Sequence, residues 1–194
     1  MPDTDLNSKV FPNIEIPVDD DAKTRVTTEL DFDADGKQIS HLRIPFSRNN
    51  SAWGRVLLPI AQFKNGDGPT MLITGGIHGD ELEGPVSLIK LIQRLKVENV
   101  KGRVIIMPAV NLPAHLSATR LSPVDNLDLN RNFPGKRDGT LTQVIAHYIN
   151  RILIPKSDIV LDMHSGGTSL DFAPCVVMHS LDDKEQEKKT LDAV

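Results

Sequence analysis

Two glycine-rich segments of the sequence place histidine and carboxylate side chains close together. They are Gly75-Gly76-Ile77-His78-Gly79-Asp80-Glu81 and Asp162-Met163-His164-Ser165-Gly166-Gly167. Two imidazoles and one glutamate form a known ligand set for catalytic zinc, which keeps its fourth position for water or substrate. We therefore expect His78, Glu81 and His164 to bind Zn²⁺, one ion per chain.

The spacing of three residues between His78 and Glu81 is weak evidence alone, because His179 and Asp182 have the same spacing. A chain with 26 acidic residues and six histidines is expected to contain such a pair by chance. Position carries more weight, since His78 and His164 each follow a short apolar run, and glycines let the backbone approach a ligand. The alternative is that these residues are hydrogen-bonded parts of a structural turn.

A long segment without periodicity, between Val110 and Thr140, contains many hydrogen-bond donors. Such connections are usually functional or disordered. It includes Arg120 and the run Asn126-Leu127-Asp128-Leu129-Asn130-Arg131-Asn132-Phe133-Pro134-Gly135. Arginine binds carboxylates well because its planar fork donates two parallel hydrogen bonds. Arg131, assisted by Asn130, could therefore hold a substrate carboxylate; the alternative is that Arg120 and Arg131 are surface charges.

The chain pattern around these segments predicts an α/β fold. Apolar runs predict strands at residues 71–74, 103–110 and 158–163, and apolar periodicity predicts a helix through Leu82, Val86, Ile89 and Ile92 and another over 141–154, ending at Pro155. Alternating strands and helices imply a mainly parallel sheet, and ligands bind at the carboxyl ends of its strands. His78 and His164 should therefore meet at one edge.

Three regions are expected along the 194 residues. Residues 1–22 are polar and acidic, which is typical of an N-terminal arm. Residues 23–69 contain turn clusters and short alternating segments, at 25–32, 41–46 and 53–63, which predict N-terminal antiparallel strands. Residues 70–194 should form the zinc-binding α/β domain.

Composition excludes several partners and sites. A formal net charge of −4 offers no basic patch for nucleic acid or for an anionic membrane surface. No apolar run approaches the roughly 20 residues that span a bilayer, so we expect a cytoplasmic protein. Cys175 is the only cysteine, which excludes an intrachain disulfide and a zinc site of paired thiolates. A homo-oligomer is compatible with the sequence.

Three motifs together resemble the succinylglutamate desuccinylase and aspartoacylase family, whose members are relatives of zinc carboxypeptidases. These motifs are Gly76-Ile77-His78-Gly79-Asp80-Glu81, Asn130-Arg131-Asn132-Phe133-Pro134-Gly135 and Asp162-Met163-His164-Ser165-Gly166, and they occur in the family's order. The similarity covers residues from about 40 to 194. It implies a zinc-carboxypeptidase-like fold, with a mainly parallel or mixed sheet flanked by helices.

The resemblance also implies an activity and a role for each site residue. The two histidines and Glu81 would be the zinc ligands, Arg131 with Asn130 would hold the substrate carboxylate, and Arg120 would polarise the scissile carbonyl. Zinc would lower the pKa of a bound water and polarise the amide. The expected activity is removal of an acyl group from the α-nitrogen of a small amino acid.

Finer features point to one branch of the family. Asn65-Gly66-Asp67-Gly68-Pro69-Thr70 and Ser165-Gly166-Gly167 resemble the branch that removes acetyl from N-α-acetyl-L-2,4-diaminobutyrate in ectoine breakdown. The alternatives are a succinylglutamate desuccinylase or aspartoacylase-like hydrolase, a non-catalytic zinc-binding fragment, and an α/β binding module without metal. A substrate with two carboxylates would need an extra cation in its pocket.

The general base is the main departure from the family pattern. The family's base is a glutamate well downstream of the third metal ligand, whereas only Glu185 and Glu187 follow His164 here. Both lie in a run of alternating charge that is typical of a solvated helix face. We therefore expect the base beyond Val194 and the catalytic domain to be incomplete at its C-terminus. Asp80 and Asp162 are expected either to orient the ligand histidines or to serve a turn.

Overall fold

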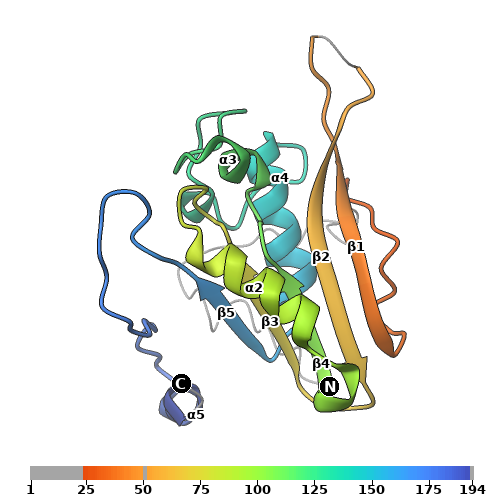
Figure 1. The fold of residues 1–194 in the computed structure, drawn as a ribbon, viewed down its shortest axis with the longest axis vertical. Helices are drawn as coiled ribbons and strands as arrows, with labels where there is room; N and C mark the ends of the chain where they lie inside the picture. Colours follow the sequence, from red (N-terminus) through yellow and green to blue (C-terminus); the bar gives the residue numbers. More distant parts are fainter. Residues whose placement is uncertain (1–23, 50–51, 193–194) are drawn as a thin grey trace. The chain divides into compact units, whose positions relative to one another are not determined.

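The computed structural model describes residues 24–49 and 52–192. Within them, five strands form one mixed sheet in the order β1-β2-β4-β3-β5 (Figure 1). The strand β3 pairs in parallel with β4 and β5, while β2 pairs antiparallel with β1 and β4. The strands are β1 (Gly36–Pro45), β2 (Arg55–Asn65), β3 (Thr70–Gly75), β4 (Gly102–Met107) and β5 (Ile159–Met163). The α/β class and the mixed sheet are confirmed.

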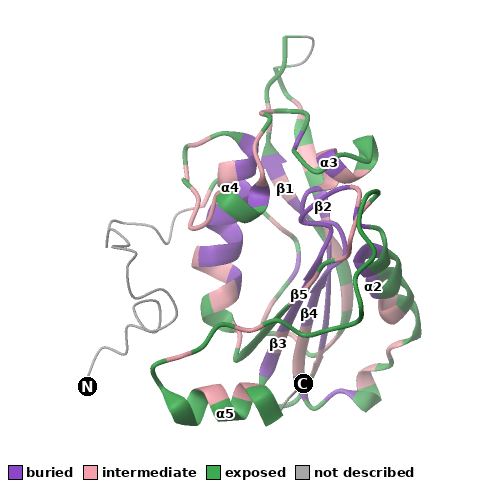
Figure 2. Ribbon diagram, turned by 90° about the vertical axis from the view of Figure 1, so that its left-hand side faces the viewer, coloured by how far each residue is buried: buried purple, intermediate pink, exposed green. Residues whose placement is uncertain are grey.

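Helices cover both faces of this sheet. The helices α2 (Glu83–Arg94) and α4 (Leu141–Tyr148) lie on opposite faces, as Figure 2 shows. Neighbouring residues of β3 point to different layers: Leu72 packs in the core on the α4 side, and Ile73 packs with Leu88 of α2. Because both faces of β3 are covered, its sequence is continuously apolar rather than alternating.

The predicted helix over 141–154 is confirmed in extent but changes type along its length. Thr140 and Gln143 form a capping box that satisfies backbone donors at the start of α4. The path then continues as a π-helical turn, η3 (Ile149–Leu153), and as a 3₁₀ turn, η4 (Ile154–Lys156), which contains Pro155. Proline lacks the backbone N–H that an α-helix would need there.

The strand predicted over residues 25–32 is wrong. Only one bridge forms there, between Thr27 and Arg43. The amide of Gln62 instead donates hydrogen bonds to the carbonyl oxygens of Asp31 and Ala34, so a buried side chain takes the place of a strand ladder. The next strand, β1, begins at Gly36 rather than at residue 41, because it pairs with β2 over its whole length.

The apolar face predicted for α2 is also partly wrong. Leu82, Val86 and Ile89 are exposed, whereas Leu88 is buried and Leu91 packs beside it against the sheet. The sheet-facing stripe is therefore rotated from the predicted one. The remaining short elements are η1 (Val97–Asn99), α3 (Leu112–Ser117) and η2 (Leu129–Arg131); α3 and η2 lie in the segment that shows no periodicity.

Residues 171–192 belong to a separate unit of the chain. They contain the helix α5 (Lys184–Asp192), and none of its residues is buried. Its charges pair along the helix, as between Lys189 and Glu185 at 2.9 Å, which confirms the predicted charged helix face. Across the described ranges, every helix is too short or too polar to cross a membrane.

Candidate metal centre

The loop after β3 is shaped by two glycines. Gly76 has a φ of 69°, a conformation that side chains with a Cβ rarely adopt. A Cβ on Gly79 would lie 2.0 Å from the carbonyl carbon of Ala114 in α3, so only glycine fits there. The side-chain amide of Asn111 donates a hydrogen bond to the carbonyl oxygen of Ile77, at 3.2 Å. Residues 110–119 therefore hold the loop that carries His78.

The carboxylate of Glu81 joins the two histidines predicted as metal ligands. Its Oε1 lies 2.7 Å from Nδ1 of His78, and its Oε2 lies 2.9 Å from Nδ1 of His164. The backbone N–H of Ser165 donates to the same Oε2 at 2.9 Å. One ligand atom from each of the three residues lies within 4.8 Å of the others. The predicted cluster is thus assembled in the structure.

Sheet register explains why the cluster forms. β3 and β5 are parallel, and Gly75 lies opposite Met163, so both chains leave the sheet at the same level. His164 follows β5 directly, and His78 follows β3 after two residues, Gly76 and Ile77. His78 and Glu81 are buried, whereas His164 is more exposed.

Asp162 orients His164. Its Oδ2 lies 2.7 Å from Nε2 of the imidazole, while its Oδ1 accepts a hydrogen bond from the Thr74 hydroxyl at 2.7 Å. These interactions with Asp162, with a smaller contribution from Glu81, raise the pKa of His164 to about 9, against an opposing effect of burial. The predicted role of Asp162 as an acceptor is therefore confirmed by geometry. Asp80 differs: its Oδ1 is buried without a hydrogen-bond partner among the described residues.

Asp128 plays the corresponding part for His78, which the sequence analysis missed. Its Oδ1 lies 3.2 Å from Nε2 of His78 and also accepts the backbone N–H of Asn130 at 2.9 Å. A carboxylate within the donor-rich loop could have been noticed, because a ligand histidine usually gives its second N–H to a carboxylate or carbonyl. The sequence offered several candidates and no way to choose among them.

The donor set fits a zinc ion. When each neutral histidine donates its Nε2 proton to an aspartate, both Nδ1 atoms are unprotonated and face the oxygens of Glu81. In this tautomer the lone pair of each Nδ1 can bind a metal ion, beside the carboxylate oxygens of Glu81. Two neutral imidazoles and one carboxylate are the ligand set typical of catalytic zinc. His78, Glu81 and His164 would hold the ion.

The other predicted site residues lie at different distances from this cluster. Arg120 is beside it, with Nη1 3.4 Å from Nδ1 of His78 and 3.9 Å from Oε1 of Glu81. Asn130 and Arg131 lie in η2 and are exposed. Asn130 lines a small cavity of about 80 Å³ that also includes Asp162 and is otherwise mainly apolar. Arg131 makes no hydrogen bond or ion pair through its side chain within the described residues.

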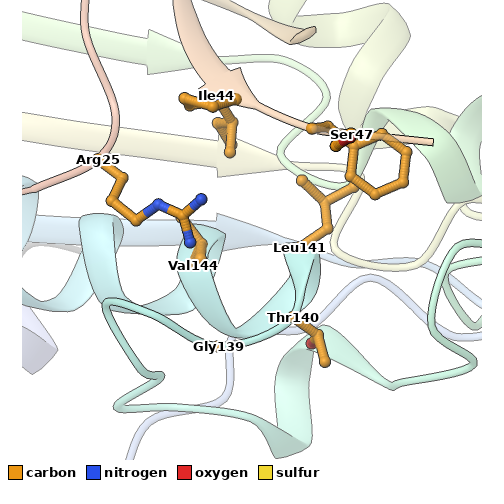
Figure 3. A pocket seen from close by; sticks show the side chains of 9 residues that line it. Arg25, Ile44, Ser47, Gly139, Thr140, Leu141 and Val144 are labelled. Carbon is orange, nitrogen blue, oxygen red and sulfur yellow. The ribbon is translucent and has the colours of Figure 1, made fainter. Parts of the chain in front are cut away.

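A larger cavity, of about 190 Å³, contains none of the predicted site residues (Figure 3). It lies between the end of β1 and the start of α4, where Ile44, Leu141 and Val144 form an apolar wall beside Arg25. Its residues supply no metal-ligand set. The chemistry of the predicted ligands therefore places the candidate site at the sheet edge rather than in the larger cavity.

Fold and cluster together define an α/β protein with a His–Glu–His cluster, able to hold a metal ion, at the carboxyl edge of a mixed sheet. Comparison with known families agrees with this class and identifies a particular family within it. Residues 67–194 match the succinylglutamate desuccinylase/aspartoacylase catalytic domain. The chain belongs to this family.

Individual relatives are similar over most of this chain. An N-α-acetyl-L-2,4-diaminobutyric acid deacetylase from Halomonas elongata is 50% identical over 167 residues, which are 86% of this chain and 49% of the relative. Two solved structures match with a TM-score of 0.85 over 88% of this chain and 52% of theirs. They are a succinylglutamate desuccinylase/aspartoacylase from Rhodobacter sphaeroides, 50% identical, and the product-bound ectoine utilization protein EutE (DoeB) from Ruegeria pomeroyi, 46% identical. The chain thus spans about half the length of these relatives.

Proposed function

We propose that this chain carries the zinc site of an amidohydrolase that removes the acetyl group from N-α-acetyl-L-2,4-diaminobutyrate. The observation that supports the zinc site most strongly is the orientation of the two histidine rings. Both Nδ1 atoms face Glu81, and both Nε2 atoms face an aspartate. The 50% identity to the Halomonas elongata deacetylase and the similarity to the ectoine utilization protein support the substrate.

Each site residue has a distinct task in this proposal. Bound zinc would polarise the amide carbonyl and make water a better nucleophile at neutral pH. The guanidinium of Arg120, beside the ligand atoms and half-exposed, would stabilise negative charge that develops on the carbonyl oxygen. Arg131 is exposed and could form a bidentate ion pair with the substrate carboxylate, with the Asn130 amide beside it.

No described carboxylate at the centre is suited to act as the general base. Asp128 and Asp162 are engaged by the histidines. Glu83 accepts a hydrogen bond from the Ser165 hydroxyl, which lowers its pKa, whereas a general base works best with a pKa near the working pH. This observation favours a second candidate function, a zinc-binding chain that does not turn over substrate by itself.

The decisive experiment measures zinc and acetate on the same samples of the purified chain. Zinc content is determined by elemental analysis after reconstitution, and acetate release is assayed with N-α-acetyl-L-2,4-diaminobutyrate. N-succinylglutamate and N-acetylaspartate are assayed in parallel, because the relative from Rhodobacter sphaeroides bears the desuccinylase/aspartoacylase name. His164→Ala tests the site, and His179→Ala is the matched control, since His179 is exposed and lies outside the cluster.

We expect about one zinc per chain in the parent and in His179→Ala, and little in His164→Ala. Acetate release from the diaminobutyrate derivative would support the deacetylase, and faster release of succinate or of aspartate would favour the alternative substrates. Zinc without turnover of any substrate would support the non-catalytic candidate. Equal zinc in all three proteins, or none in the parent, would contradict the site itself.

A further inference from the structure

Asp128 contacts both a zinc-ligand candidate and the arginine beside it. Its Oδ1 lies 3.2 Å from Nε2 of His78, and its Oδ2 lies 3.3 Å from Nη2 of Arg120. The two oxygens of one carboxylate therefore face two groups with different expected tasks. One group holds the metal ion, and the other stabilises charge on the substrate.

The carboxylate of Asp128 is itself held firmly. Asp128 is the N-cap of η2, and its Oδ1 accepts the backbone N–H of Asn130 at 2.9 Å. Its side chain is 16% exposed, whereas the side chain of Arg120 is 50% exposed. A long, exposed arginine has many rotamers and needs a fixed partner to hold one of them. Asp128 is placed to be that partner.

The other aspartate of the centre provides a comparison. Asp162 also faces the Nε2 atom of a ligand histidine, at 2.7 Å, but its second oxygen accepts the hydroxyl of Thr74 instead of a cation. The two aspartates thus share one function toward zinc and differ in their contact with Arg120. This difference allows the two roles of Asp128 to be separated by experiment.

We propose that Asp128 is a positioning residue that orients His78 and Arg120 together, so that one carboxylate aligns the metal ligand with the group that polarises the carbonyl. The inference rests on the proposed zinc site. Asp128 acts through the two groups that it contacts and carries out no chemical step itself. Its consequence is energetic coupling: a change at Arg120 should alter zinc binding differently when the Asp128 charge is absent.

A double-mutant cycle on zinc affinity tests this coupling. The zinc dissociation constant is measured by competition with a chromophoric chelator for the parent, Asp128→Asn, Arg120→Gln and the double variant. Asparagine keeps an acceptor for His78 and for the Asn130 N–H, but it removes the charge that faces Arg120. The matched control cycle replaces Asp128→Asn by Asp162→Asn.

We expect Asp128→Asn and Asp162→Asn each to weaken zinc binding by about tenfold or more, as is usual for carboxylates behind a ligand histidine. The Asp128–Arg120 cycle should depart from additivity by about fivefold, whereas the Asp162–Arg120 cycle should be additive within about twofold. If the parent does not bind zinc, the proposed function fails. If the parent binds zinc and the Asp128–Arg120 cycle is additive, the positioning role is overturned.

A second measurement does not depend on the variants folding. In the zinc-loaded parent protein with ¹⁵N-labelled histidine, long-range nitrogen–proton correlations report which nitrogen of His78 carries the proton. Orientation by Asp128 requires the proton on Nε2 and zinc on Nδ1. Zinc on Nε2 would overturn the inference, since Asp128 could not then accept a proton from that atom.

Discussion

The metal-ligand cluster and the loop that carries Arg120, Asn130 and Arg131 are positioned in different ways. His78 and His164 follow adjacent parallel strands, so sheet register fixes where their backbones leave the sheet. Each imidazole is then bonded through both nitrogens. In contrast, Asn130 and Arg131 are exposed. The proposed ion site is thus prearranged, while the groups proposed to bind substrate depend on how one loop is anchored.

Two aspartates anchor the loop through their side chains. Asp128 caps η2 and reaches His78, and Asp125 accepts hydrogen bonds from the backbone and hydroxyl of Thr142, at 2.9 and 2.8 Å. These aspartates tie the loop to the cluster on one side and to the start of α4 on the other. Removing Asp128 should therefore affect zinc, whereas removing Asp125, the anchor at α4, should affect stability and leave zinc in place.

The largest effect is expected from Gly79→Ala. The new Cβ would lie 2.0 Å from the Ala114 carbonyl carbon, so α3 or the loop of His78 must move. Overpacking of this kind costs about 3 kcal/mol. We expect this loss in the free energy of unfolding, measured by urea denaturation, together with loss of most bound zinc.

Gly66→Ala is the control for this substitution. Gly66 has a positive φ of 67° but open space around its Cβ position, so the change adds backbone strain without a clash. We expect it to cost about 1 kcal/mol and to keep full zinc content. Zinc binding by Gly79→Ala at the parent's level would show that the cluster does not depend on the rigid turn.

Much of the ion site could be predicted from the sequence, because strand ends and histidines are both visible in it. The apolar runs located β3 and β5, and parallel pairing then required His78 and His164 to meet. Asp162 lies two residues before His164 and was recognised as a candidate acceptor. In this part of the molecule, local pattern and sheet topology determine the same arrangement.

The contacts of Asp128 could not be predicted in the same way, since they depend on how a nonperiodic segment folds. Neither α3 nor η2 leaves a periodic signal, because both are short. The strand prediction for residues 25–32 was wrong for a related reason. The side-chain amide of Gln62 donates a hydrogen bond to the backbone of this segment, where a neighbouring strand would otherwise pair. Tertiary hydrogen bonds determine the conformation of these segments, and such bonds cannot be predicted from the composition of the chain.

The pH dependence of zinc binding gives the next largest expected effect. The carboxylate of Asp162, with that of Glu81, raises the pKa of His164 from 6.5 to about 9 in the metal-free protein. Zinc must displace this proton, so zinc affinity should rise by about tenfold per pH unit between about pH 7 and 9 and level off above that range. In Asp162→Asn the levelling should begin at lower pH, because the main cause of the raised pKa is removed.

Thermal unfolding of the zinc-free protein should show the opposite trend. A histidine whose pKa is raised in the fold stabilises it when protonated, so the contribution is complete below the unfolded pKa of about 6.5. It is lost as the pH rises through about 9. A midpoint difference between the parent and Asp162→Asn that stays constant across this range would contradict the assignment.

The smallest effect on the ion site is expected when the loop anchor Asp125 is removed. Burial raises the pKa of Asp125, but hydrogen bonds from Thr142 outweigh burial and lower it below its usual range. A carboxylate of this kind stabilises the fold above its unfolded pKa of about 4, and the contribution is lost in acid. Asp67 is an exposed turn residue and offers a control of the same chemistry.

Asp125→Ala should lower the free energy of unfolding by about 2 kcal/mol at neutral pH, the size of hydrogen bonds to a charged group. The difference from the parent should shrink as the pH falls from about 4 through the lowered pKa of Asp125, and Asp67→Ala should stay within about 0.5 kcal/mol of the parent throughout. Zinc affinity should change by less than about twofold, because the ligands are fixed by β3, β5 and their own aspartates. A tenfold loss of zinc affinity in Asp125→Ala would mean that the anchor at α4 also positions the ligands, and the contrast between the two anchors would fail.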